Sequence, residues 1–332
     1  MRPMIATLCF LATPAVAQEA PRVVADIAPI RSLVAQIMDG VGSPSQLIPT
    51  GASPHGYAMR PSEARALGEA ELVVWVGPAL THWLEDPLDT LSGDALRLTL
   101  MDHGGSKTLP MREAEYLGSH EHDHAEAHGD EGHADHAGHA DHSEHEGHAE
   151  HKDHAAHVGH DHHGDIDPHG WLSPSNAVLW AGLIAQQLSE IDPDNAATYD
   201  TNWRTFTADV QSLEQELAAQ MEPYRDTPFM VMHDAFQYFE ATFGVEADAF
   251  IVPGDGSAPG PARIKALRDH LAEHPAVCAF TAPQENDALL RTALEGQPTR
   301  VAVLDPIGDG ETPYGTLMRQ FADNMVACFE GE

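Results

Sequence analysis

Residues 72–77 read Leu-Val-Val-Trp-Val-Gly, an apolar run that continues without a polar break until the glycine. A strand with one face in water alternates apolar and polar residues, whereas a parallel strand buried on both faces reads as an unbroken apolar run. The stretch therefore predicts a parallel strand with helices on both sides. Upstream, the short β-like run 22–25 precedes an amphipathic stretch over 30–37 with helical spacing.

The last third of the chain repeats this alternation of strand and helix. Strand-like runs lie at 229–232, 247–252, 276–281 and 300–304, and helical patterns lie at 235–243, 261–273, 285–294 and 313–328. Strands and helices in turn predict parallel sheets that are covered on both faces. Between the two halves, residues 195–221 carry few helix breakers and place apolar side chains three and four apart, which predicts one long helix. The expected fold class is α/β, with two parallel-sheet lobes joined by that helix.

The N-terminal residues 1–17 have the pattern of a secretory signal. Arg2 precedes a short apolar run, and Ala15, Val16 and Ala17 supply the small residues that a signal peptidase needs before Gln18. The apolar run is much shorter than the roughly 20 residues that span a bilayer. We therefore expect removal of the segment and a soluble protein in the periplasm.

Length and charge limit the organisation and the partners. Removal of 17 of the 332 residues leaves 315, more than one hydrophobic core usually holds, so two lobes are expected. We divide the chain into a first lobe at 18–193, a connecting helix at 194–224 and a second lobe at 225–332. The formal net charge of −35 argues against nucleic acid or anionic membranes as partners and suits a protein that attracts cations.

One segment of the first lobe, 119–165, differs in composition from the rest of the chain. It holds sixteen of the 23 histidines, and from His133 to His160 a histidine recurs at every third residue. That spacing fits neither a half-buried strand nor a packed helix face, and the segment lacks the apolar residues needed to offset ordering entropy. We expect a disordered loop that binds transition metals; the alternative is a solubilising insert.

The sequence contains three cysteines, of which Cys9 lies in the expected signal segment. Cys278 and Cys328 remain, and an even pair in an oxidising compartment favours a disulfide. Such a bridge would close a loop of about 50 residues and stabilise the fold by roughly 4 kcal/mol in the chain-entropy model. Two separately buried thiols are the alternative, while metal ligation is weaker because no CxxC pair exists.

Four polar residues stand where strand-like runs end or where the next loop opens. His55 lies shortly after the run 47–48, His169 lies in a turn-rich stretch, and His233 and Asp305 directly follow the runs 229–232 and 301–304. In open α/β sheets, ligands bind beyond the carboxyl ends of the strands. Because two of the four residues come from each half of the chain, we expect them to meet in the cleft between the lobes.

Three imidazoles and one carboxylate or water match the ligand preference of Zn²⁺. A set of oxygen ligands alone would instead suggest Mg²⁺ or Ca²⁺. Each ligating histidine needs an acceptor for its second ring nitrogen. Asp234, Glu240 and backbone carbonyls are the candidates that the neighbouring sequence offers.

Four stretches of this chain resemble a known family. They are GASPHGY at 51–57 with RPS at 60–62, DPHGWLSP at 167–174, HDAFQYFE at 233–240 and LDP at 304–306. Their order and spacing from about Val23 to the C-terminus are similar to those of the metal-binding receptors of ABC importers, the cation solute-binding proteins, and among these to the zinc receptors.

The resemblance implies a monomeric periplasmic receptor that captures Zn²⁺ between two lobes with limited hinge motion and delivers it to a membrane permease. The resemblance implies that the metal ligands are His55, His169 and His233, and it also implies the Cys278–Cys328 bridge. Manganese receptors of the family typically have Glu at the position of His233, so this residue favours zinc.

The fourth ligand is left open by the resemblance. Some zinc receptors carry an acidic residue directly before the first histidine, but this chain has Pro54 there. Asp305 or a water molecule is therefore the expected fourth ligand. Asp305 also suits the turn before Pro306, because Asp is a common turn residue.

Functions other than zinc import are alternatives that the sequence leaves open. A zinc hydrolase would need an open metal position and a general base such as Glu240 or Asp305. The HExxH match at 120–124 lies in a tract without the apolar helix face that this motif needs, and no P-loop or dinucleotide fingerprint is present. A periplasmic metal buffer or adhesin, or a receptor for another divalent metal such as Mn²⁺, would use the same cleft. His270 and His274 are four apart on a predicted helix, and a solvated helix face explains them best.

Overall fold

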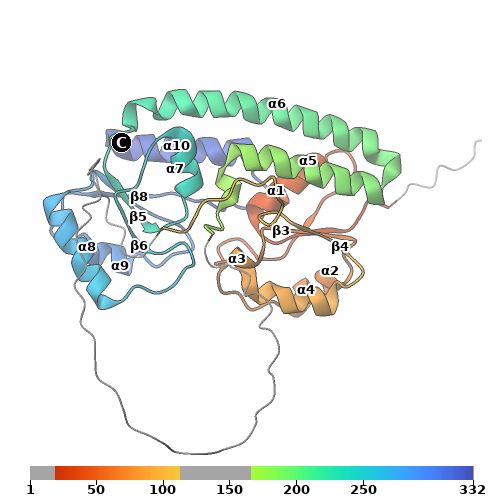
Figure 1. Ribbon diagram of the computed structural model, residues 1–332, viewed down its shortest axis with the longest axis horizontal. Coiled ribbons are helices and arrows are strands. Elements are labelled where there is room, and N and C mark those ends of the chain that lie inside the picture. Colours follow the sequence, from red (N-terminus) through yellow and green to blue (C-terminus); the bar gives the residue numbers. More distant parts are fainter. Residues whose placement is uncertain (1–18, 113–165, 332) are drawn as a thin grey trace, which may run out of the picture.

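The computed structural model describes residues 19–112 and 166–331 of the chain (Figure 1). The expected signal segment 1–17 and the histidine-rich segment 119–165 lie outside these residues. Within them, no helix has the length and apolar character needed to cross a bilayer.

Two four-stranded parallel sheets form the two lobes, as the sequence predicted. The first sheet has the order β2-β1-β3-β4 and the second has the order β6-β5-β7-β8. The strands are β1 Val23–Ala25, β2 Ser45–Gln46, β3 Leu72–Trp75, β4 Leu96–Thr99, β5 Phe229–His233, β6 Ala249–Val252, β7 Cys278–Thr281 and β8 Arg300–Val303. The two sheets share one topology, so their carboxyl ends supply equivalent loops.

Ten α-helices cover the sheets in the described ranges. They are α1 Ala28–Ile37, α2 Pro61–Gly68, α3 Pro78–Thr81, α4 Glu85–Leu91, α5 Pro174–Ile191, α6 Ala196–Met221, α7 Gln237–Phe243, α8 Pro261–Glu273, α9 Ala288–Ala293 and α10 Tyr314–Glu330. Four short 3₁₀ helices accompany them: η1 His82–Leu84, η2 Gly170–Leu172, η3 Pro193–Asn195 and η4 Glu222–Tyr224.

The unbroken apolar runs arise because each sheet has a helix layer on either face. In β3, Val73 packs toward α2 and α4, whereas its neighbours Leu72 and Val74 pack into the core with α1 and α5. In the second lobe, Met230 packs toward α8 and α9, and Val231 packs toward α7 and α10. Successive side chains of a strand point to opposite faces, so strands covered on both faces need apolar residues at every position.

The long helix α6 runs along both lobes, with α5 and α1 beneath it on the first lobe and α10 and α7 on the second (Figure 1). It confirms the predicted helix 195–221 to within a residue. Its buried stripe consists of Tyr199, Phe206, Val210, Leu213, Leu217 and Met221. This stripe belongs to a core that is continuous through both lobes, and a large apolar contact of that kind restricts relative movement of the lobes.

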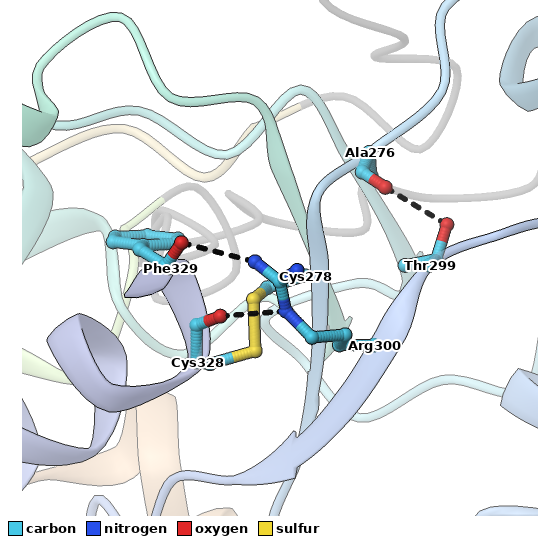
Figure 2. Close-up of a disulfide and its surroundings, with 6 residues drawn as sticks. All are labelled: Ala276, Cys278, Thr299, Arg300, Cys328 and Phe329. Carbon is cyan, nitrogen blue, oxygen red and sulfur yellow. Dashed lines mark hydrogen bonds between the residues drawn. A yellow bond between two sulfur atoms is a disulfide. The ribbon is translucent and has the colours of Figure 1, made fainter. Parts of the chain in front are cut away.

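The predicted disulfide is present between Cys278 on β7 and Cys328 on α10 (Figure 2). Beside it, the Arg300 guanidinium donates to the carbonyl oxygens of Cys328 and Phe329 at 2.8 and 3.0 Å. The last carbonyls of a helix have no partner within the helix, so this arginine caps α10. The disulfide and the cap together fix the C-terminal helix to the second sheet.

Candidate metal centre

His55, His169 and His233 meet at the carboxyl ends of the two sheets. His55 lies in the loop between β2 and α2, His169 directly precedes η2, and His233 is the last residue of β5. One ring nitrogen from each lies within 4.8 Å of the corresponding atoms of the other two. The ring centroids are 5.6 Å apart for His55 and His169, 5.2 Å for His55 and His233, and 5.1 Å for His169 and His233.

The closest approach in this group joins His169 and His233. Their Nε2 atoms are 3.3 Å apart. Burial, and next the neighbouring His169 imidazole, lower the pKa of His55 to about 3. Burial, and then the two neighbouring imidazoles, lower the pKa of His233 well below its ordinary value. His55 and His233 are therefore neutral near pH 7, in the form that binds metal ions.

A buried carboxylate orients His169. Asp167 Oδ1 lies 2.7 Å from His169 Nδ1 and accepts the backbone N–H of the same residue at 2.9 Å. Tyr238 in turn donates its hydroxyl to the backbone oxygen of Asp167 at 2.8 Å. Because Nδ1 is turned toward Asp167, the Nε2 atom of His169 points toward the other two histidines.

The other two histidines are held by the loop that follows β6. The backbone of Pro253 forms a hydrogen bond with His233. Gly256 has a φ of +74°, and a Cβ atom there would lie 3.0 Å from the Cγ atom of His55. Glycine at position 256 therefore lets this loop of the second lobe lie against a histidine of the first lobe without backbone or steric strain.

Asp234 and Glu240 bind an arginine instead of the histidines, although the sequence offered them as acceptors. The Arg112 guanidinium donates to both Asp234 oxygens and reaches Glu240 Oε2 at 2.8 Å. Burial raises the pKa of Glu240 to about 7, and Arg112 opposes that shift. The side chains of Arg112, Asp234 and Glu240 are only 9%, 2% and 4% exposed. A residue that precedes the histidine-rich segment in the chain is thus tied to the second lobe beside His233.

The three histidines line a cleft of about 330 Å³ between the lobes. Trp171 of η2 and Pro306 of the loop after β8 also line it, and the Trp171 indole donates to the Pro306 oxygen at 2.7 Å. Glu285, from the loop after β7, lines the cleft as well and was missed by the sequence analysis. Its position beyond a strand end is the signal that could have found it, since the other loops of this edge were chosen on that ground.

Asp305 also lies at this edge, directly after Leu304. Its Oδ1 atom accepts the backbone N–H groups of Ile307 and Gly308, at 3.0 Å each. Asp305 thus stabilises the turn after β8, a role that its sequence position also suggested. It does not belong to the group formed by the three histidines, so a bond from Asp305 to the metal stays a prediction.

Comparison with known proteins gives consistent matches over nearly the whole chain. Residues 23–328 match the family described as ZnuA, "Zinc-uptake complex component A periplasmic". The chain is 42% identical over 315 residues to the high-affinity zinc uptake system protein ZnuA of Paracoccus denitrificans, covering 93% of this chain and 92% of the relative. It is 38% identical over 316 residues to the ZnuA protein of Brucella abortus, covering 94% and 92%.

The fold is similar to that of solved structures. A crystal structure of a ZnuA protein superposes with a TM-score of 0.71 over 93% of this chain and 99% of that one. The sequence identity in that comparison is 21%, so it supports the arrangement of the two lobes and their connecting helix.

Proposed function

The chain belongs to the ZnuA family of periplasmic zinc-uptake components, and from that premise we propose that it captures Zn²⁺ on His55, His169 and His233. It is a periplasmic solute-binding protein that delivers zinc to a membrane ABC importer, and it is not an enzyme. The zinc ion is its cargo, held between the lobes until the permease receives it.

The observation that carries the ligand assignment is the 3.3 Å between the Nε2 atoms of His169 and His233. Zinc bonds imidazole nitrogen at 2.0–2.1 Å, and a tetrahedral angle then places two such nitrogens about 3.3 Å apart. The pair therefore has the separation that a shared zinc ion requires. His55, from the loop between β2 and α2, supplies the third nitrogen.

Hydrogen bonding at the other ring nitrogens supports the same assignment. His169 Nδ1 faces the Asp167 carboxylate, so Nδ1 carries the proton and Nε2 carries the free lone pair. With Nε2 of His233 turned toward His169, Nδ1 is the nitrogen left to donate to Pro253. Two lone pairs then face each other across 3.3 Å, which is repulsive unless a cation lies between them.

For the fourth position we propose Asp305 or a water molecule. A water fits a receptor that must later release its cargo, because the ion then has one fewer bond to the protein. Three imidazoles favour zinc over Mn²⁺, which prefers oxygen ligands. The alternative of a manganese receptor is therefore less consistent with this ligand set.

Several features of the chain outside the cleft are also proposals. We propose that residues 1–17 are a signal peptide removed on export, and that the lobes extend over 18–193 and 225–332 with the connecting segment 194–224. We further propose that the segment 119–165 collects zinc at lower affinity than the cleft, because its composition predicts an entropic cost for ordering its ligands. We also propose that the receptor is a monomer.

A zinc titration of the full-length protein against a chromophoric chelator tests the cleft assignment. The chelator masks weak binding, so the titration reports the tight site. We expect one tight equivalent in the wild type and in His103→Ala, since His103 is exposed and lies outside the cleft. His233→Ala should lose that equivalent; tight binding that persists in this variant would refute the ligand assignment.

A further inference from the structure

A second pair of imidazoles lies on the second lobe, at the C-terminal end of α8. His270 is in the last turn of this helix and His274 is its C-cap residue, whose backbone N–H donates to the His270 oxygen at 2.8 Å. Side chains four residues apart on a helix lie on the same face, one turn from each other. The two rings are accordingly neighbours, with centroids 5.0 Å apart and an interplanar angle of 37°.

This spacing is close to that of the histidines in the cleft. The three cleft pairs have centroid separations of 5.1 to 5.6 Å. Two imidazoles that bind one metal ion at 2.0–2.1 Å with a tetrahedral angle have centroids about 5 Å apart. The pair on α8 therefore has the ring spacing of a two-histidine chelate.

An unsatisfied ring nitrogen provides a second observation. The Nε2 atom of His270 is buried and has no hydrogen-bond partner among residues 19–112 and 166–331. A buried polar nitrogen normally has a partner, and its absence calls for an explanation such as an ion.

The surroundings also favour a cation. Asp248 and Glu273 lie close enough to His270 to act on it electrostatically, and both act in the direction that favours positive charge. Arg263 acts in the opposite direction and more weakly than either acidic residue. In addition, the last turn of α8 carries the negative end of the helix dipole.

We propose that His270 and His274 form a second metal site, a two-imidazole chelate at the end of α8 that takes Zn²⁺ or another divalent transition-metal ion of its class. Water molecules complete the coordination. The site lies on the outer helix layer of the second lobe, where α8 and α9 pack together (Figure 1). It is separate from the cleft and does not depend on the function proposed for the cleft.

Histidine footprinting with diethyl pyrocarbonate on the full-length protein tests this site under buffered free Zn²⁺. After reduction of the Cys278–Cys328 disulfide, trypsin releases the peptide 269–291 with only these two histidines, 98–107 with only His103, and 226–263 with only His233. At a free Zn²⁺ concentration about ten times the dissociation constant, modification of His270 should slow about tenfold. The exposed His103 should react at the same rate throughout.

Two variants distinguish direct binding from indirect effects. His274→Ala should abolish the protection of His270, and His274→Gln is a second variant should the first fold poorly. His233→Ala should leave the protection of His270 intact, because it alters only the cleft. Unprotected His270 in the wild type, protection that survives both changes at position 274, or protection that is lost in His233→Ala would each overturn the proposal.

Discussion

Removal of the Asp167 carboxylate should weaken zinc binding without removing any proposed ligand. Asp167 Oδ1 lies 2.7 Å from His169 Nδ1 and also accepts the His169 backbone N–H at 2.9 Å. Both side chains are only 3% exposed, so bulk water does not compete for these contacts in the wild type. In Asp167→Ala, the His169 ring loses the acceptor that fixes its tautomer and its orientation.

The expected magnitude follows from these contacts. Loss of the partner of a metal-ligating histidine lowers metal affinity by about 10- to 100-fold, which corresponds to about 1.4 to 2.7 kcal/mol. Because two hydrogen bonds are lost and both are buried, we expect the upper part of that range. Asp167→Asn keeps an acceptor oxygen but no charge, so its loss should be smaller.

Competition with a chromophoric chelator measures the change in dissociation constant directly. Asp94→Ala is the matched control. This aspartate is exposed, belongs to the same lobe in the loop between α4 and β4, and does not line the cleft. Thermal unfolding of the metal-free variants separates lost stability from lost affinity. A dissociation constant for Asp167→Ala within twofold of the wild-type value would refute the role assigned to this carboxylate.

Three further predictions concern other contacts of the cleft. Arg112→Ala should destabilise the metal-free protein by about 3 to 5 kcal/mol in chemical denaturation, because it leaves two buried carboxylates without a cation. Adding Glu240→Gln to this variant should recover part of the lost stability. Equal stability of the single and double variants would contradict this role of Arg112. Gly256→Ala should lower the free energy of unfolding by about 1 to 2 kcal/mol and weaken zinc binding. The reasons are the φ of +74° at this position and the close contact that the new Cβ would make with the His55 ring. Gly104→Ala, at an open position without a positive φ, should change neither quantity in the same assays. Because the pKa of His55 is lowered to about 3 in the folded state, the unfolded chain binds the proton first as pH falls below about 6.5. From pH 7.5 to 5.5, the free energy of unfolding of the metal-free wild type should therefore fall by about 1.4 kcal/mol more than that of His55→Gln. If chemical denaturation gives the same difference in stability between the two proteins at both pH values, the ring is not buried in its neutral form.

The parts of the fold that the sequence predicted are those with a strong local pattern. Strands buried on both faces have unbroken apolar runs, and α6 has a long amphipathic period, so both were found with nearly correct bounds. The edge strand β4 was missed because Leu96 and Arg97 are exposed and the run is not apolar. The helix α2 was missed for the same reason, since Leu67 is its one fully buried residue among the eight.

Two histidines of the cleft were predictable from position, because His233 ends β5, His55 lies in the loop after β2, and parallel topology brings such loops to one edge. His169 precedes η2, far from any strand end, and was predicted through the resemblance of its stretch, 167–174, to the metal-receptor family.

The supporting contacts of these histidines were not predictable, because they join residues far apart in the chain. Arg112 and Asp234 are 122 residues apart, and no local pattern pairs them. Asp167 is only two residues from His169, but its role depends on how the turn before η2 folds.

The most direct test of the central claim is a crystal structure of the full-length protein with Zn²⁺, using anomalous diffraction on both sides of the zinc absorption edge. We predict one strong peak in the cleft, about 2.0 to 2.1 Å from the Nε2 atoms of His169 and His233 and from one ring nitrogen of His55. A cleft without a zinc peak, or a peak bonded to fewer than these three side chains, would contradict the account.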